Sequence, residues 1–69
     1  MIALTVNGKP RSLERSMTLL EYLEQLQINP QIIAVEHNGE ILRRERYGQT
    51  RLADGDVLEI VRMVGGGNL

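Results

Sequence analysis

The sequence predicts an α+β fold in which one amphipathic helix packs on one face of a mixed sheet of four to five strands. Three observations support this class: apolar alternation near the start, one helical repeat of leucines in the first half, and two strand-like apolar runs after it. At 69 residues the chain has room for a single domain with a small core. We therefore expect one domain over residues 1–64, followed by a flexible glycine-rich tail over residues 65–69.

The first two strands are predicted to form a hairpin. Ile2, Leu4 and Val6 alternate with small or polar residues, which is the pattern of a half-buried strand. The dipeptide Asn7-Gly8 suits the positive φ angles of a tight turn. Residues 9–13 are therefore expected to return antiparallel to the first strand.

A helix is expected to begin after Thr18. The Thr18 hydroxyl can cap the helix start, and Glu21 can accept a hydrogen bond from the Thr18 amide, which completes a capping box. Asn29-Pro30 closes the helical segment. The face that packs on the sheet is predicted to consist of four leucines at helical spacing: Leu19, Leu20, Leu23 and Leu26.

The next strand is expected well inside the sheet. Residues 32–36 form a short, β-branched and nearly continuous apolar run, as is typical of a buried strand. Asn38-Gly39 supplies a second tight turn, after which Ile41 and Leu42 are predicted to form a brief edge strand.

The last strand is predicted to be the longest. Residues 43–47 form a charged connector, and the turn Asp54-Gly55-Asp56 precedes an apolar run over residues 57–64. If Leu58 and Ile60 face the helix, alternation along the strand places its other residues on the far side of the sheet. We predict that these residues form an exposed surface that binds a partner protein: Val57, Glu59, Val61 and Met63. Ordinary surface apolarity, or edge pairing between two copies, would also explain them.

Composition excludes several classes of function. The formal net charge of -1 offers no positive excess for a nucleic-acid backbone, so no nucleic-acid partner is expected. The absence of cysteine excludes a thiol nucleophile and a thiolate metal site. No signal-like start and no apolar run of bilayer length is present, so we expect a soluble cytoplasmic protein without membrane contact.

Few residues in the body of the chain suggest chemistry. His37 is the single histidine, and its place beside a turn favours a solvated side chain with no role. Asp54 and Asp56 flank a turn glycine, which predicts local hydrogen bonding, and no metal site is expected. The arginines of the connector are interpreted as a solvated face, with docking of an acidic partner as the lesser alternative: Arg43, Arg44, Arg46 and Arg51.

The carboxyl end is the most informative segment. The run Val64-Gly65-Gly66-Gly67 passes from a strand-like residue into three glycines and is followed by Asn68-Leu69. Glycine lacks Cβ, so such a segment can enter a channel too narrow for side chains. A frayed terminus is the competing interpretation.

The order and spacing of these features resemble the ThiS family of sulfur carriers of thiamine biosynthesis. The likeness extends over essentially the whole chain. It rests on the first Asn-Gly hairpin, the amphipathic helix and four later segments: Val35 to Ile41, Arg44 to Tyr47, Asp54 to Val61 and the glycine end. The resemblance implies the ubiquitin-like β-grasp fold, shared with the small subunit of molybdopterin synthase.

The resemblance also implies a chemistry. The terminal glycine of such a carrier is adenylated by an ATP-dependent, E1-like activating enzyme and converted to a thiocarboxylate, which delivers sulfur to thiazole synthase. The carrier is then a protein cosubstrate rather than an enzyme, without a cofactor or catalytic residues of its own. Here Gly67 would carry the sulfur after a processing protease removes Asn68 and Leu69, and Gly65 and Gly66 would form the threading tail.

Two alternatives remain open at this stage. The first is a carrier like the molybdopterin-synthase small subunit, although that class usually has a more aromatic body and this chain lacks Phe and Trp. The second is a ubiquitin-like interaction module, or a modifier whose glycine end is joined to a lysine of another protein.

Overall fold

The structure is a computed structural model that describes residues 1–63. Its strands are β1 (Ile2–Val6), β2 (Lys9–Leu13), β3 (Ile33–His37), β4 (Glu40–Leu42) and β5 (Val57–Arg62). The helices are α1 (Leu19–Gln25) and two 3-10 turns, η1 (Pro30–Ile32) and η2 (Arg44–Arg46).

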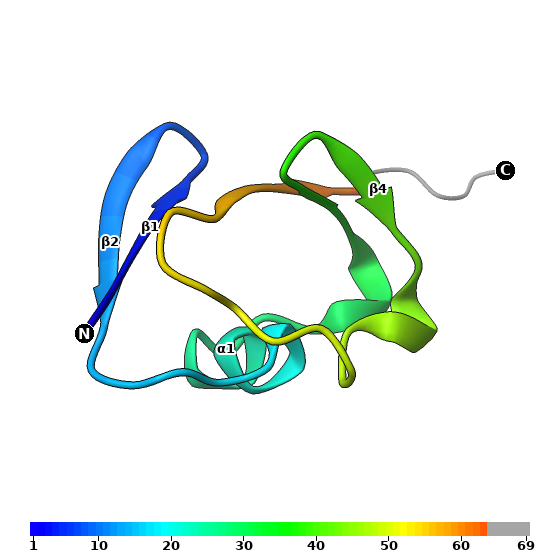
Figure 1. The fold of residues 1–69 in the computed structure, drawn as a ribbon. Helices are drawn as coiled ribbons and strands as arrows, with labels where there is room; N and C mark the ends of the chain where they lie inside the picture. The colour runs from blue at the N-terminus through cyan, green and yellow to red at the C-terminus, as the bar shows by residue number, and fades with distance from the viewer. Residues whose placement is uncertain (64–69) are drawn as a thin grey trace, which may run out of the picture.

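The strands form one mixed sheet with β5 at its centre. The order is β2-β1-β5-β3-β4, in which β1 and β5 run parallel and every other neighbouring pair is antiparallel. Figure 1 shows β5 crossing between the two hairpins, with α1 on one side of the sheet. The predicted fold class, a mixed sheet of four to five strands with one helix on one face, is confirmed, and the sheet has five strands.

Both hairpins turn on an Asn-Gly dipeptide, as predicted. Asn7 and Gly8 have φ angles of 52° and 79°, and Asn38 and Gly39 have 53° and 86°. Positive φ at both central residues gives a twist that matches the flanking strands. The register that follows pairs Val6 with Lys9 in the first hairpin and His37 with Glu40 in the second.

The capping box at the start of α1 is confirmed. The Thr18 hydroxyl accepts a hydrogen bond from the Glu21 amide at 3.1 Å, and the Glu21 carboxylate accepts one from the Thr18 amide at 2.8 Å. That bond from the Thr18 backbone is the main reason why the pKa of Glu21 lies below its ordinary value.

The helix ends earlier than predicted. Gln27 has a φ of 61°, and the Ile28 amide donates to the Leu23 carbonyl at 2.9 Å, which closes a Schellman-type end. Leu26 becomes the cap residue and remains 43% exposed, so its predicted place on the core face is wrong. Tyr22 takes that place, with only 3% of its surface exposed.

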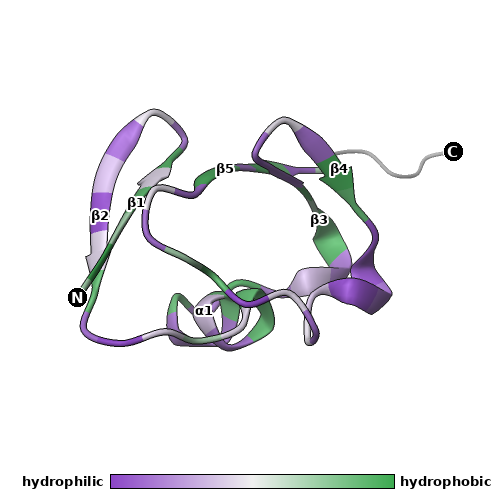
Figure 2. Ribbon diagram, in the orientation of Figure 1, coloured by the Kyte–Doolittle hydropathy of each residue, from purple (hydrophilic) through white to green (hydrophobic). Residues whose placement is uncertain are grey.

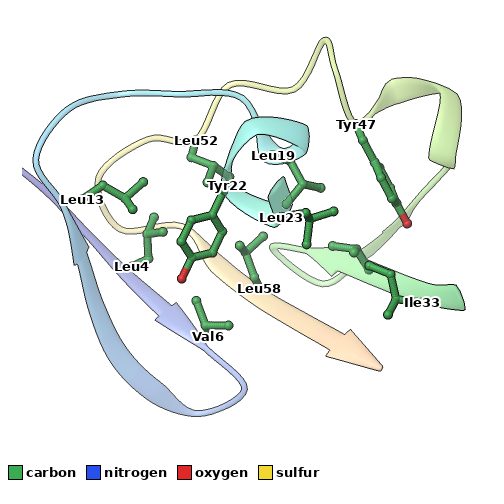
Figure 3. Packing of buried hydrophobic residues seen from close by; sticks show 11 residues of the cluster. Leu4, Val6, Leu13, Leu19, Tyr22, Leu23, Ile33, Tyr47, Leu52 and Leu58 are labelled. Carbon is green, nitrogen blue, oxygen red and sulfur yellow. The ribbon is translucent and has the colours of Figure 1, made fainter. Parts of the chain in front are cut away.

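The core lies between α1 and the inner face of the sheet. Leu19, Leu23 and Leu58 are completely buried there, and Leu58 contributes from the central strand (Figure 3). Tyr47 and Leu52 also reach the core, although they come from the connector between β4 and β5. Figure 2 shows hydrophobic residues on β3 and β5 and mainly hydrophilic residues on β2 and η2.

β3 occupies an interior place in the sheet, as predicted, but only one of its faces is covered. Ile33 and Val35 are buried against the core, whereas Glu36 between the paired strands is exposed. The strand begins one residue later than expected, because Ile32 belongs to η1 and is 39% exposed.

Candidate functional site

The predicted polarity of β5 is confirmed. Leu58 is buried on the helix side, while Val57, Val61 and Met63 are 42%, 57% and 46% exposed. Glu59 is exposed between them. We call these four residues, Val57, Glu59, Val61 and Met63, the outer strip. Alternation along a central strand therefore places apolar side chains on the uncovered side of the sheet.

Cross-strand register widens the outer strip. Val61 is opposite Ala34, and Glu59 is opposite Glu36, which is in turn opposite Ile41 on β4. Ile41 is 79% exposed. Two glutamates directly opposite each other on one face destabilise a sheet modestly. The outer face thus combines apolar side chains with a pair of negative charges, and sequence reasoning missed Glu36 and Ile41 because only the register reveals them.

Asn7 holds β5 from the side of the first hairpin. Its side-chain oxygen accepts a hydrogen bond from the Ile60 amide at 2.7 Å, and its side-chain nitrogen donates to the Ile60 carbonyl at 3.2 Å. The backbone ladder between β1 and β5 pairs Thr5 with Val57 and Val6 with Leu58. The Asn7 amide group therefore continues the ladder where β1 turns away.

Asn38 holds β5 from the side of the second hairpin. Its side-chain oxygen accepts a hydrogen bond from the Val57 amide at 2.8 Å, and its backbone amide donates to the Val57 carbonyl at 2.8 Å. Its side-chain nitrogen donates to Asp56 at 3.1 Å. Turn asparagines thus hold β5, and hence the outer strip, at Val57 and at Ile60.

His37 is not the solvated side chain that its place in the sequence suggests. Its Nε2 lies 2.9 Å from the Asp56 carboxylate, and its side chain is only 23% exposed. Asp56 also accepts a bond from the Ala53 amide at 2.9 Å. The local bonding predicted for Asp56 is present, but the carboxylate additionally connects β3, the second turn and the start of β5.

The pKa of Asp56 reflects two opposing effects. Burial raises the pKa, because it disfavours the charged carboxylate, whereas hydrogen bonds from His37, Ala53 and Asn38 stabilise that charge. The net pKa lies below the ordinary value. Asp56 is thus a structural anion whose charge helps to fix the second turn on β5.

The other polar residues singled out above have structural contacts. Asp54 accepts a hydrogen bond at 2.7 Å from the amide of Ala3, which is distant in sequence, and not the local bond that was predicted, so it fastens the third turn to β1. Arg44 donates from Nε to the Pro30 carbonyl at 2.9 Å, while Arg43 lies 3.7 Å from Glu45 in an exposed pair. The arginines 43, 44, 46 and 51 are all exposed, as the solvated-face interpretation predicts.

The predicted sulfur-carrying and threading residues, Gly67, Gly66 and Gly65, lie outside the described residues, as do Val64, Asn68 and Leu69. The division into a domain over residues 1–64 and a tail over residues 65–69 therefore stays a prediction. Among residues 1–63, the single α-helix is too short to cross a bilayer.

Comparison with known proteins identifies the family. The model of the ThiS family matches residues 4–67. The sulfur carrier protein ThiS of Bacillus subtilis is 42% identical over 65 residues, which cover 93% of this chain and 98% of that protein. A thiazole synthase of Paramagnetospirillum magneticum is also 42% identical over 65 residues, but this chain spans only 20% of its length.

A solved structure has the same architecture. The crystal structure of the thiamine biosynthesis protein ThiS of Geobacter metallireducens has a TM-score of 0.84 and 39% sequence identity, covering 96% of this chain and 100% of that one. The agreement in sequence, length and topology leads to one conclusion: this chain belongs to the ThiS family and has the ubiquitin-like β-grasp fold.

Proposed function

We propose that this protein is a sulfur carrier of thiamine biosynthesis whose Gly67 is converted to a thiocarboxylate. The observation that carries the proposal is the family match, which includes all three tail glycines and ends at Gly67. Relatives of similar length are named sulfur carrier proteins. The chain is then a substrate of other enzymes rather than a catalyst.

The chemistry requires a free carboxylate at Gly67. The carboxylate attacks the α-phosphate of ATP and releases pyrophosphate, which gives a glycyl adenylate with AMP as leaving group. Hydrosulfide, or a donor equivalent to it, then displaces AMP and leaves the thiocarboxylate. Since the chain has no cysteine, the sulfur comes from another molecule. Removal of Asn68 and Leu69 by a processing protease is the step that exposes this carboxylate.

The outer strip is the proposed docking surface for the ATP-dependent activating enzyme. Its exposed apolar side chains are those of Val57, Val61 and Met63. They belong to the central strand and to the residue that follows it, and the tail comes next in the sequence. The opposed carboxylates of Glu36 and Glu59 favour a partner that brings a cationic side chain between apolar ones.

Thiazole synthase is the proposed recipient of the sulfur. Thiazole synthases of two organisms contain a segment similar to this chain within their own, longer sequences. That association supports a partnership between a carrier of this kind and the synthase.

An in vitro loading assay tests the proposal. A form ending at Gly67, incubated with the activating enzyme, ATP and a sulfide donor, should gain the mass difference of one oxygen replaced by sulfur. The 69-residue form should not gain this mass, because its Gly67 carbonyl is part of a peptide bond. Equal loading of both forms would exclude chemistry at Gly67.

A matched pair of variants separates threading from folding. Gly66→Val in the form ending at Gly67 should abolish loading, because a branched side chain obstructs an extended segment in a narrow channel. Its melting temperature should equal that of the unmodified form. A stable adduct with a lysine of another protein, found in cells instead of a thiocarboxylate, would favour the modifier alternative.

A further inference from the structure

The inner face of the sheet is only partly covered by α1. The helix has seven residues, and residues of β1, β2 and β5 line an opening beside the segment that follows it. A groove of about 670 Å³ lies between these strands and the segment that follows the helix. It opens on the side of the sheet opposite the outer strip, so it is a separate surface.

The groove has an apolar floor and a basic rim. Leu26 and Ile32 are 43% and 39% exposed in it, although both are large apolar residues. Lys9, Arg11 and Arg62 surround them. Within residues 1–63 none of these three cations forms an ion pair. The rim therefore presents positive charge that the described part of the chain leaves uncompensated.

The basic side chains of β2 point to this side of the sheet because side chains alternate along the strand. Leu13 is buried against the core, so alternation places Arg11 and Lys9 on the same inner face. They remain exposed because the helix does not reach them. A strand that continued an ordinary core would carry apolar residues at these positions.

Tyr22 adds a polar group at the floor. The residue is 97% buried, yet its hydroxyl makes no hydrogen bond within residues 1–63, while every fully inaccessible side-chain polar atom there has a partner. The hydroxyl is therefore open to the groove, which Tyr22 lines. Figure 3 shows the hydroxyl directed away from α1 toward Val6, which also lines the groove.

We propose that this groove binds an acidic segment of a partner protein in which an apolar side chain is flanked by carboxylates. The apolar side chain would pack on Leu26 and Ile32, and the carboxylates would pair with Lys9 and Arg11 and accept a hydrogen bond from the Tyr22 hydroxyl. The proposal is independent of the sulfur chemistry, because no part of it involves the tail.

The recognition is through side chains rather than strand addition. β2 is an edge strand, but Pro10, its second residue, has no backbone N–H to donate. An added strand would lack that hydrogen bond. The occupant therefore has to be selected by the apolar floor and by the charges of the rim.

Titration of the full-length chain with defined peptides tests the proposal by nuclear magnetic resonance. The probe is acetyl-Glu-Leu-Glu-Leu-Glu-amide, and the matched control is acetyl-Lys-Leu-Lys-Leu-Lys-amide. The acidic peptide should cause saturable chemical-shift changes at the amides of Lys9, Gln27 and Arg62, and the basic peptide should not.

Two variants and one charge-matched control assign the binding. The double variant Lys9→Glu and Arg11→Glu should raise the dissociation constant at least about tenfold, and Tyr22→Phe should raise it about fivefold. The variant Arg15→Glu and Arg43→Glu changes the net charge equally at exposed sites outside the groove, and should leave the constant within about twofold. Equal weakening by both charge variants, equal binding of the basic peptide, or shifts confined to the outer strip would overturn the proposal.

Discussion

The two Asn-Gly turns hold the same strand with different chemistry. Asn7 and Asn38 have nearly the same φ, 52° and 53°, and each side chain bonds to the backbone of β5. The Asn7 side chain bonds to neutral backbone groups of Ile60. Asn38 also donates to the carboxylate of Asp56, which lies beside His37.

The same Asn-Gly turn can therefore contribute to stability in a way that depends on pH or in a way that does not. The contribution of the Asn7 turn involves no titratable group and should therefore not depend on pH. The contribution of the Asn38 turn depends on the charge of Asp56, because a protonated carboxyl accepts hydrogen bonds more weakly. The following variants test this contrast in order of decreasing expected effect on stability.

The largest effect is expected for Asp56→Ala. Asp56 is 8% exposed, and its removal leaves three donors without their acceptor: His37 Nε2, Asn38 Nδ2 and the Ala53 amide. We expect urea denaturation to show a loss of about 2–4 kcal/mol in the free energy of unfolding. Asp54→Ala is the control, because exposed Asp54 accepts one bond from Ala3, and its loss should be about 1 kcal/mol or less. Equal losses in the two variants would contradict the central role of Asp56.

A direct comparison of the turns uses Asn38→Gly and Asn7→Gly. Glycine adopts positive φ without strain, so each substitution removes only the side-chain contacts. Asn38→Gly should lower the free energy of unfolding by about 2 kcal/mol, because it also removes a donor from buried Asp56. Asn7→Gly should lower it by about 1 kcal/mol, because its partner groups on Ile60 are near solvent. A larger loss for Asn7→Gly would show that the Asn7 side-chain contacts stabilise the fold more than those of Asn38.

The pH dependence should separate the turns further. The pKa of Asp56 is lower in the folded protein than its ordinary value, so the ionised carboxylate stabilises the fold above the unfolded pKa of about 3.9. This stabilisation is lost as the pH falls through the folded pKa. Asp56→Asn should therefore lose less stability than the natural protein between about pH 5 and pH 2, and Asn7→Gly should lose as much as the natural protein does.

Glu21 is a second group that makes the stability depend on pH. Its pKa is also lowered, chiefly by the hydrogen bond from the Thr18 amide, so some acid sensitivity remains in Asp56→Asn. Combining Asp56→Asn with Glu21→Gln should further reduce the decrease in the free energy of unfolding at acid pH. If Asp56→Asn lost as much stability at acid pH as the natural protein, the contribution of the second turn to stability would not depend on the charge of Asp56.

The smallest effect on stability is expected at the outer strip, beyond the contacts that the two asparagines make with β5. Val61 is 57% exposed, so Val61→Asp should lower the free energy of unfolding by only about 1 kcal/mol or less, mainly because Asp is unfavourable in a strand and adds a charge near Glu59. Its binding to the activating enzyme, measured by calorimetry, should weaken at least about tenfold. Met63→Asp should behave similarly. A large loss of stability without a loss of binding would mean that the strip supports the fold rather than a partner.

Local signals made much of this structure predictable. The turns at Asn7-Gly8 and Asn38-Gly39 and the capping box at Thr18 depend on residues that are close in sequence, so their geometry follows from backbone preferences. The exposure of the outer strip also followed, because successive side chains of a strand alternate once one of them is assigned to the core.

Contacts between distant residues depend on how the whole chain packs. His37 meets Asp56 across 19 positions, and Glu36 meets Glu59, because β3 has a particular register against β5. No local pattern specifies that register, which depends on how the whole inner face packs. For the same reason the helix pattern included Leu26, whereas the packed helix ends before it and buries Tyr22 instead. Local patterns thus specify the strands, the tight turns and the start of α1, whereas packing decides where α1 stops, which strands meet and therefore which surfaces remain open.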